Sequence, residues 1–136
     1  MALTKDRATP RRDGHPSPFP VAADTVIFGG SLVALEGGYL VPAKTATGLV
    51  AVGRAEQHVD NRDGAPGALT CEVMPGVYPW DNSLGDDLIT QAEVGSTVYM
   101  VDDHTVAKTH GTNTRSAAGV LLGIDSEGVW VATVGW

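Results

Sequence analysis

The residues with the clearest chemical potential are Asp102, Asp103 and His104, the only run that joins adjacent carboxylates to a histidine. Carboxylate oxygens and imidazole nitrogens bind divalent metals, but a metal site needs three or four ligands that converge on one point. Consecutive residues of a strand point to opposite faces. Because β-rich segments flank this run on both sides, we expect a turn in which the Asp side chains bind the local backbone.

The remaining histidines offer no metal-binding pattern. His15 and His58 have no nearby Cys or His partner, and His110 lies six residues beyond His104. The sequence also contains no nucleophile elbow, dinucleotide-binding glycine motif or Walker-type phosphate loop. We therefore expect no metal, no cofactor and no enzymatic activity.

Four other side chains suggest binding. Trp80, Trp130 and Trp136 could form a platform for sugar rings, although tryptophans in a short-stranded β domain more often fill a core or an interface. The guanidinium of Arg115 could pair with a carboxylate of another strand or subunit. We take Arg115, Trp130 and Trp136 as candidate subunit-interface residues.

The elements that must position these side chains are mostly strands. Alternating apolar and polar residues, bounded by Gly, Pro, Asn and Asp clusters, predict an all-β body. The Gly-Gly pair at 37–38 is typical of a two-residue hairpin. The expected strands are residues 25–28, 31–35, 39–41, 49–58, 68–78, 97–101, 105–108, 117–124 and 129–134.

Three features refine this pattern. Residues 86–94 carry a short apolar stripe with a capping Asp and a following Gly, which predicts one short helix. Residues 117–124 are almost uninterruptedly apolar, so we expect a central strand covered on both sides. Cys71, the single cysteine, is expected to be a small buried side chain. No internal repeat is evident.

Composition narrows the class of protein. The chain has 136 residues, 43% of them apolar and 6% aromatic, which suits one β-rich domain. Nine basic residues stand against sixteen acidic ones, and this balance disfavours nucleic-acid binding. The start lacks the apolar stretch of a signal peptide, and no apolar run reaches the roughly 18 residues of a membrane span.

The first 23 residues differ from the rest. Residues 1–20 have a net charge of +2, from four basic and two acidic residues, which leaves −9 on the remainder. Four prolines remove backbone donors and favour extended conformations. We expect an extended arm over residues 1–23 and a β-rich body over residues 24–136. Disorder without a role is the alternative. The arm's candidate contact residues are Lys5, Arg7, Arg11, Arg12, Pro16, Pro18 and Phe19.

The last third of the chain resembles the capsid decoration, or cement, proteins of tailed bacteriophages. The similar residues are Val-Gly-Ser-Thr-Val-Tyr-Met-Val-Asp-Asp-His-Thr-Val-Ala (94–107), Gly-Thr-Asn-Thr-Arg (111–115) and Ala-Ala-Gly-Val-Leu-Leu-Gly-Ile-Asp-Ser-Glu-Gly-Val-Trp-Val (117–131). About forty residues are similar in this way, and residues 29–59 add a looser likeness.

The resemblance implies a small β-barrel or β-tulip-like domain that forms a homotrimer. It further implies a position on the outer capsid surface of the virion, where the trimer binds the major capsid protein and bridges neighbouring capsomers. Synthesis in the host cytoplasm, without nucleic-acid or membrane partners, would accompany this role. Another virion structural protein (a head fibre base, a tail or a connector component) and a carbohydrate-binding module are the alternatives.

Overall fold

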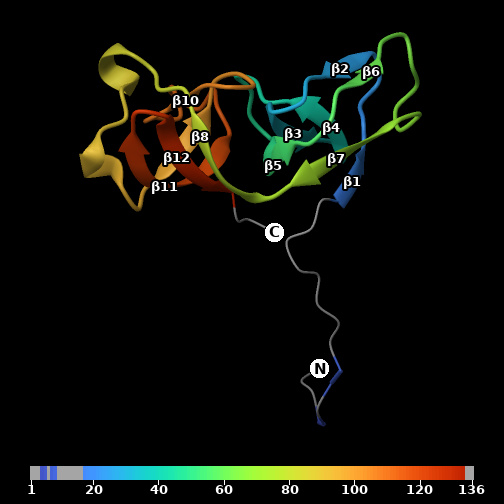
Figure 1. Cartoon of the computed structure of the whole chain (residues 1–136), viewed down its shortest axis with the longest axis horizontal. Helices are drawn as coiled ribbons and strands as arrows, with labels where there is room; N and C mark the ends of the chain where they lie inside the picture. The colour runs from blue at the N-terminus through green and yellow to red at the C-terminus, as the bar shows by residue number, and fades with distance from the viewer. Residues whose placement is uncertain (1–3, 6, 9–16, 134–136) are drawn as a thin grey trace.

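The protein is built almost wholly from short antiparallel strands. The computed structural model describes residues 4, 5, 7, 8 and 17–133 (Figure 1). The strands are β1 (Ser17–Pro20), β2 (Thr25–Ile27), β3 (Leu32–Glu36), β4 (Tyr39–Pro42), β5 (Val50–Ala55), β6 (Val59–Asn61), β7 (Thr70–Met74), β8 (Gly76–Trp80), β9 (Thr97–Met100), β10 (Val106–Ala107), β11 (Ala117–Asp125) and β12 (Gly128–Thr133). Two 3-10 turns, η1 (Gly85–Asp87) and η2 (Gln91–Glu93), are the helical elements of the described part. The all-β prediction is confirmed.

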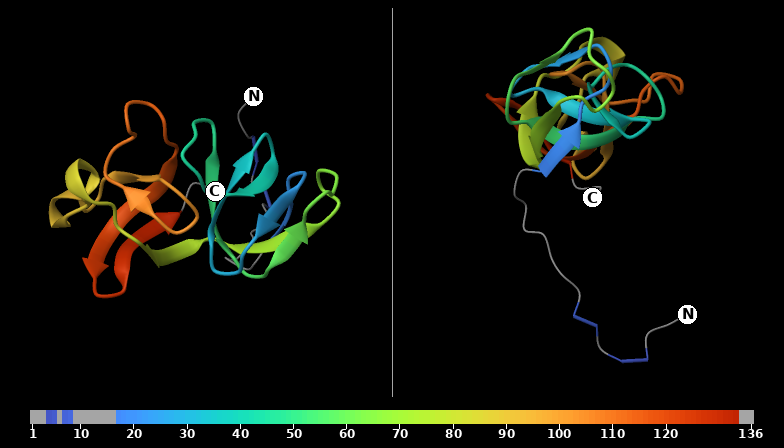
Figure 2. Two further views of the ribbon diagram at one scale, coloured as in Figure 1. Left: turned by 90° about the horizontal axis from the view of Figure 1, so that it is seen from above. Right: turned by 90° about the vertical axis from the view of Figure 1, so that its right-hand side faces the viewer.

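Two five-stranded sheets lie side by side, with a small third sheet on one of them (Figures 1 and 2). The first sheet has the order β1-β7-β5-β3-β4, and the second has the order β10-β9-β11-β12-β8. Strands β2 and β6 pair with each other. The chain passes from the first sheet to the second between β7 and β8, where Pro75 interrupts the strand pattern.

Each five-stranded sheet curls until its edge strands almost meet. In the first sheet, one isolated bridge joins Val21, next to β1, to Leu40 of β4. In the second, a bridge joins Asp81, next to β8, to Thr105, next to β10. Among the described residues neither ladder closes, so the structure replaces the expected barrel with two strongly curled sheets.

The two sheets are built in the same way, although the sequence shows no evident repeat. Writing the second sheet from its other edge gives β8-β12-β11-β9-β10, and its strands then correspond one by one to β1-β7-β5-β3-β4. The correspondence preserves chain order, antiparallel pairing and the position of the single bridge. Residues 17–74, the first half, and residues 76–133, the second half, therefore share one topology.

Backbone details confirm the correspondence between the halves. The pairing of β3 with β5 skips Val52, and the pairing of β9 with β11 skips Ala118, so both halves have a β-bulge at the same place. The N–H of Gly30 donates to Ala55 O at 2.8 Å, and the N–H of Gly95 donates to Leu121 O at 2.8 Å.

Each bulged strand also contains a glycine that no other residue could replace without strain. Gly53 and Gly119 follow the skipped residues and have φ values of +139° and +153°. A methyl group on Gly53 would overlap the carbonyl of Met74 in β7, and one on Gly119 would overlap the carbonyl of Ala132 in β12. Glycine therefore allows the close approach of the neighbouring strand in both halves.

Two hydrophobic clusters hold the molecule together. The larger one lies between the two five-stranded sheets and contains Leu32, Ala34, Val41, Ala43, Leu49, Trp80, Ile89, Val98, Met100, Val106, Ala118, Leu121, Val129 and Val131. The smaller one joins the other face of the first sheet to β2 and β6, through Val21, Ile27, Val33, Leu40, Val52, Ala55, Val59, Cys71 and Val73. The predicted burial of Cys71 is confirmed.

The expected helix over residues 86–94 is wrong. Thr90 is extended and caps η2, and its hydroxyl accepts from the N–H of Ala92. The side-chain amide of Asn82 both donates to Ile89 O and accepts from Ile89 N–H, each at 2.9 Å. These hydrogen bonds take the place of the backbone hydrogen bonds of a helix. They direct the side chain of Ile89, which is 2% exposed, into the core. A tertiary contact therefore overrides the local helical pattern.

The apolar run at 117–124 forms β11, the central strand of the second sheet, as its hydrophobicity suggests. It is not covered on both faces, because only Ala118 and Leu121 are buried and Leu122 is 52% exposed. The two-residue hairpin is confirmed, since Gly37 and Gly38 connect β3 to β4 with positive φ values.

Candidate functional site

The expected arm is anchored to the body by its last residues. Strand β1 pairs antiparallel with β7, from Ser17 opposite Val73 to Pro20 opposite Thr70. Val21 is fully buried, and its N–H donates to Leu69 O at 2.9 Å. The predicted boundary between the arm and the body, after residue 23, is therefore wrong, because residues 17–21 belong to the first sheet.

The proline content of this segment is compatible with β1 because the strand lies at a sheet edge, where a missing backbone donor is tolerated. Pro18 and Phe19, predicted as arm contacts, are thus strand residues, and Phe19 packs against the smaller hydrophobic cluster. Lys5 and Arg7 are exposed. Arg11, Arg12 and Pro16 lie outside the described residues.

Arg115 forms its ion pair within the chain. Its Nη1 donates to Asp87 Oδ2 at 3.1 Å and to Thr109 O at 3.0 Å. The hydroxyl of Thr109 donates to Asp87 Oδ1 at 2.6 Å. That hydrogen bond, followed by the Arg115 guanidinium, lowers the pKa of the Asp87 carboxyl. Arg115 thereby ties η1 to the β10–β11 loop, and its contact with a second subunit stays a prediction.

The three tryptophans do not form one platform. Trp80 is 5% exposed and belongs to the larger hydrophobic cluster, as tryptophans in such a domain usually do. Trp130 is partly exposed on β12, and its indole Nε1 is buried with no hydrogen-bond partner among the described residues. Trp136 lies outside the described residues. The interface role of Trp130 and Trp136 stays a prediction.

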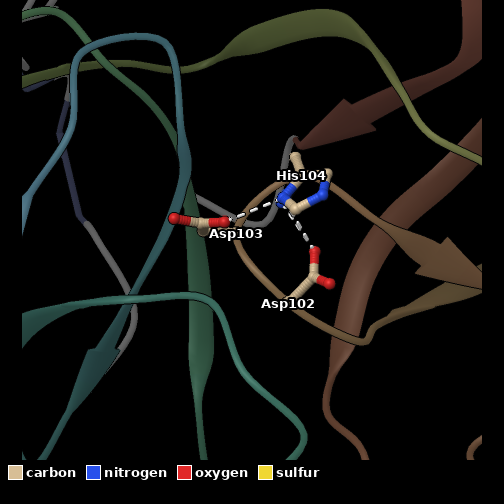
Figure 3. Close-up of side chains that lie close together, drawn as sticks. All are labelled: Asp102, Asp103 and His104. Carbon is tan, nitrogen blue, oxygen red and sulfur yellow. Dashed lines mark hydrogen bonds and ion pairs between the residues drawn. The ribbon is translucent and has the colours of Figure 1, made fainter.

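The predicted turn at residues 102–104 is confirmed. His104 Nδ1 lies 2.9 Å from Asp103 Oδ1 and 3.1 Å from Asp102 Oδ1 (Figure 3). The N–H of His104 donates to Asp102 Oδ1 at 3.0 Å, as in an Asx turn. The hydrogen bond with Asp103, followed by the charge of Asp102, raises the pKa of His104.

This turn also connects the two halves. Asp103 O accepts from the N–H of Leu32 in the first sheet at 2.8 Å, whereas within the second half His104 O accepts from the N–H of Asp81 at 2.8 Å. The three side chains are near enough for one cation, with ligand atoms within 4.8 Å of one another. Hydrogen bonding and the connecting role already account for their arrangement.

An apolar groove at the junction of the halves escaped the sequence analysis. It has a volume of about 320 Å³ and lies where β5 meets the corresponding strand β11. Ser116 lies at this junction: its hydroxyl donates to Ala46 O at 2.7 Å and accepts from Leu49 N–H at 3.0 Å. No local motif marks the groove, because it forms only when the two bulged strands are brought together.

Comparison with known proteins finds no relative: no family model, curated protein or solved structure matches the chain. Among the described residues, no helix has the length and apolar character that crossing a bilayer requires.

Proposed function

We propose that this chain is a capsid decoration protein of the tailed-phage type. In this proposal it binds the major capsid protein on the outer surface of the mature head as a homotrimer. It stabilises the shell by bridging neighbouring capsomers, and its function is adhesive rather than enzymatic.

The observation that carries the proposal is the anchoring of the basic N-terminal segment by β1. A segment that binds a partner must be held by a folded body if it is to keep that body attached. Four residues of β1 pair with β7 and hold the segment in this way. Upstream of this strand, Lys5 and Arg7 are exposed on a chain whose remainder is strongly acidic. The arrangement suits a cationic tether on a compact body.

Physical reasoning makes such a tether effective. A ligand that binds only the assembled shell stabilises it by mass action. Three tethers on one trimer raise the effective concentration of each weak contact and slow dissociation.

The test is binding to expanded heads of the phage that encodes the protein, with residues 1–16 deleted. The deletion must stop there, because removing residues 1–20 would take away β1 and expose the edge of β7. We expect the shortened protein to keep its thermal unfolding midpoint and to lose at least about 100-fold in head affinity, consistent with a loss of avidity. Equal binding of the two proteins would contradict the tether.

A charge-matched pair of variants separates the tether from general electrostatics. Lys5→Ala with Arg7→Ala removes two exposed cations from the N-terminal segment, and Lys44→Ala with Arg62→Ala removes two exposed cations from the body. At about 0.2–1 kcal/mol per exposed pair, the first variant should bind about 2- to 30-fold more weakly. The second should bind like the unaltered protein.

A further inference from the structure

The connection between β8 and β9 exposes apolar side chains at one end of the molecule. Leu84 and Leu88, the residues on either side of η1, are 87% and 42% exposed, and Val94, which follows η2, is 40% exposed. Figures 1 and 2 show this connection, in yellow, at the end remote from the first half. We call these three residues the distal surface.

Hydrogen bonds and one buried side chain hold the connection in place. Ile89 belongs to the larger hydrophobic cluster, and the side-chain amide of Asn82 bonds both its N–H and its carbonyl. The carboxyl of Asp87 accepts from Arg115, and the carbonyl of Asp87 accepts from the N–H of Lys108 at 3.0 Å. The exposed leucines are therefore carried by a fixed part of the chain, which has little conformational entropy to lose on binding.

In the first half, the corresponding connection is covered by the chain itself. It contains β2, which pairs with β6 from the connection between β5 and β7. In the second half, the counterpart of that later connection is a turn of two residues, Ser126 and Glu127, so residues 76–133 include no counterpart of β6. Each half directs one isoleucine of its connection into the core, Ile27 or Ile89, but only the first half adds a covering strand.

Charge indicates what kind of partner fits the distal surface. Residues 76–133 contain eight acidic and two basic residues, a net charge of −6, and an exposed Asp86 lies between Leu84 and Leu88. The two basic residues, Lys108 and Arg115, form ion pairs within the second half.

The body of a second copy does not complement this charge. Between residues 17 and 133, every Lys and Arg of the first half is also ion-paired within the chain, namely Lys44, Arg54 and Arg62. An apolar surface among unpaired acidic groups instead fits a different protein, one with apolar residues at the centre of its surface and Lys or Arg at the rim.

We propose that the distal surface binds a surface of this kind on the major capsid protein. The inference rests on the proposed capsid role. The tether leaves the body at β1, in the first half, whereas the distal surface lies at the far end of the second half (Figure 1). One molecule thus holds the shell at two separate places, as bridging of neighbouring capsomers requires. Contacts of opposite charge at the two ends also fix its orientation.

The test measures binding of the full chain to expanded heads of the phage that encodes it. Leu84→Ser and Leu88→Ser each remove an exposed apolar side chain and should leave the thermal unfolding midpoint unchanged. Each should bind heads at least about 10-fold more weakly, because a leucine is no longer buried in the interface. Leu69→Ser, in the first half, is the control: Leu69 is 43% exposed, nearly equal to Leu88, and this variant should bind like the unaltered protein.

A charge reversal tests whether the partner surface is basic. Asp86→Lys should bind heads about 2- to 30-fold more weakly, since it replaces an attraction between exposed charges by a repulsion. Glu36→Lys changes the net charge equally at an exposed position in the first half and should have no such effect. Equal binding by Asp86→Lys and the unaltered protein would contradict a basic partner surface.

The outcomes separate this inference from the proposed function. If the unaltered protein binds heads and Leu84→Ser binds them equally well, the distal surface is not a capsid contact, although the capsid role stands. If the unaltered protein does not bind heads, the capsid role itself fails. If sedimentation shows that Leu84→Ser loses self-association, the distal surface belongs to a second copy, which also overturns the inference.

Discussion

Replacing Gly119 by alanine should destabilise the protein far more than replacing Gly123, four residues further along β11. At Gly119 the backbone has φ of +153°, and an added methyl carbon would lie 2.9 Å from the carbonyl carbon of Ala132. The favourable carbon–carbon separation is about 3.5–4.0 Å. The neighbouring strand β12 must therefore shift, or the bulge must flatten. At Gly123 no atom lies within 4 Å of an added methyl group.

The magnitude follows from two contributions. A non-glycine residue in such a sparsely populated conformation costs about 1–3 kcal/mol, and overpacking against a neighbour adds about 1–3 kcal/mol. A total of about 2–6 kcal/mol is a large share of the 5–15 kcal/mol by which a typical domain is stable. With a guanidinium slope of about 3 kcal/mol per molar, the unfolding midpoint falls by about 0.7–2 M.

Equilibrium unfolding in guanidinium, followed by circular dichroism, measures the effect. Because the halves share one topology, Gly53→Ala should cause a similar loss, with Gly29→Ala as the control in the first half, where neighbouring atoms are at ordinary contact distances. Midpoints for Gly119→Ala and Gly123→Ala within about 0.2 M would refute the steric argument, since surface changes scatter by about 0.5 kcal/mol. A large loss at Gly119 with none at Gly53 would refute the equivalence of the halves.

Two further outcomes are expected. The pKa of His104 is raised in the folded protein, so the charged imidazole stabilises the fold below its unfolded pKa of about 6.5, and this contribution is lost as the pH rises through the higher folded pKa. The free energy of unfolding lost in His104→Gln should therefore be larger at about pH 5.5 than at about pH 9. Equal losses at the two pH values would exclude the ion pair. Ser116→Ala leaves one buried N–H and one C=O at the junction without their side-chain partner and should cost about 1–3 kcal/mol, whereas Ser126→Ala in the exposed β11–β12 turn should cost almost nothing.

The strands and turns were predictable because their signals are local. Alternation identified the segments around Cys71 and Val98, and the Gly-Gly pair identified the first hairpin. The Asp-Asp-His run was correctly interpreted as a turn because β-rich segments flank it. In these places propensity, pattern and tertiary structure agree.

The common topology of the halves was not predictable, because it is carried by backbone geometry rather than by side chains. The halves share short matches, such as Gly-Ser at 30–31 and 95–96 and Ala-Lys-Thr at 43–45 and 107–109. The halves also carry different insertions: the first contains β2 and β6, and the second contains the two 3-10 turns. The positive φ of Gly53 and Gly119 would have been the best signal, but only the folded chain shows it.

The candidate site was predictable only in part. Basic residues and prolines marked the N-terminal segment, yet composition did not reveal that residues 17–21 pair with β7, since edge pairing depends on a distant strand. Arg115 was identified as an ion-pair former, but its partner Asp87 lies 28 residues away. The groove beside Thr133 has no sequence signature because its walls come from four strands.

The central claim is that this protein decorates an assembled capsid. Cryo-electron microscopy of expanded heads, prepared with and without the full-length protein, tests it most directly. The account predicts added density on the outer surface at the local threefold positions, with three copies of the two-sheet body in each. Heads that stay bare at saturating protein, or density confined to the tail or its connector, would contradict it.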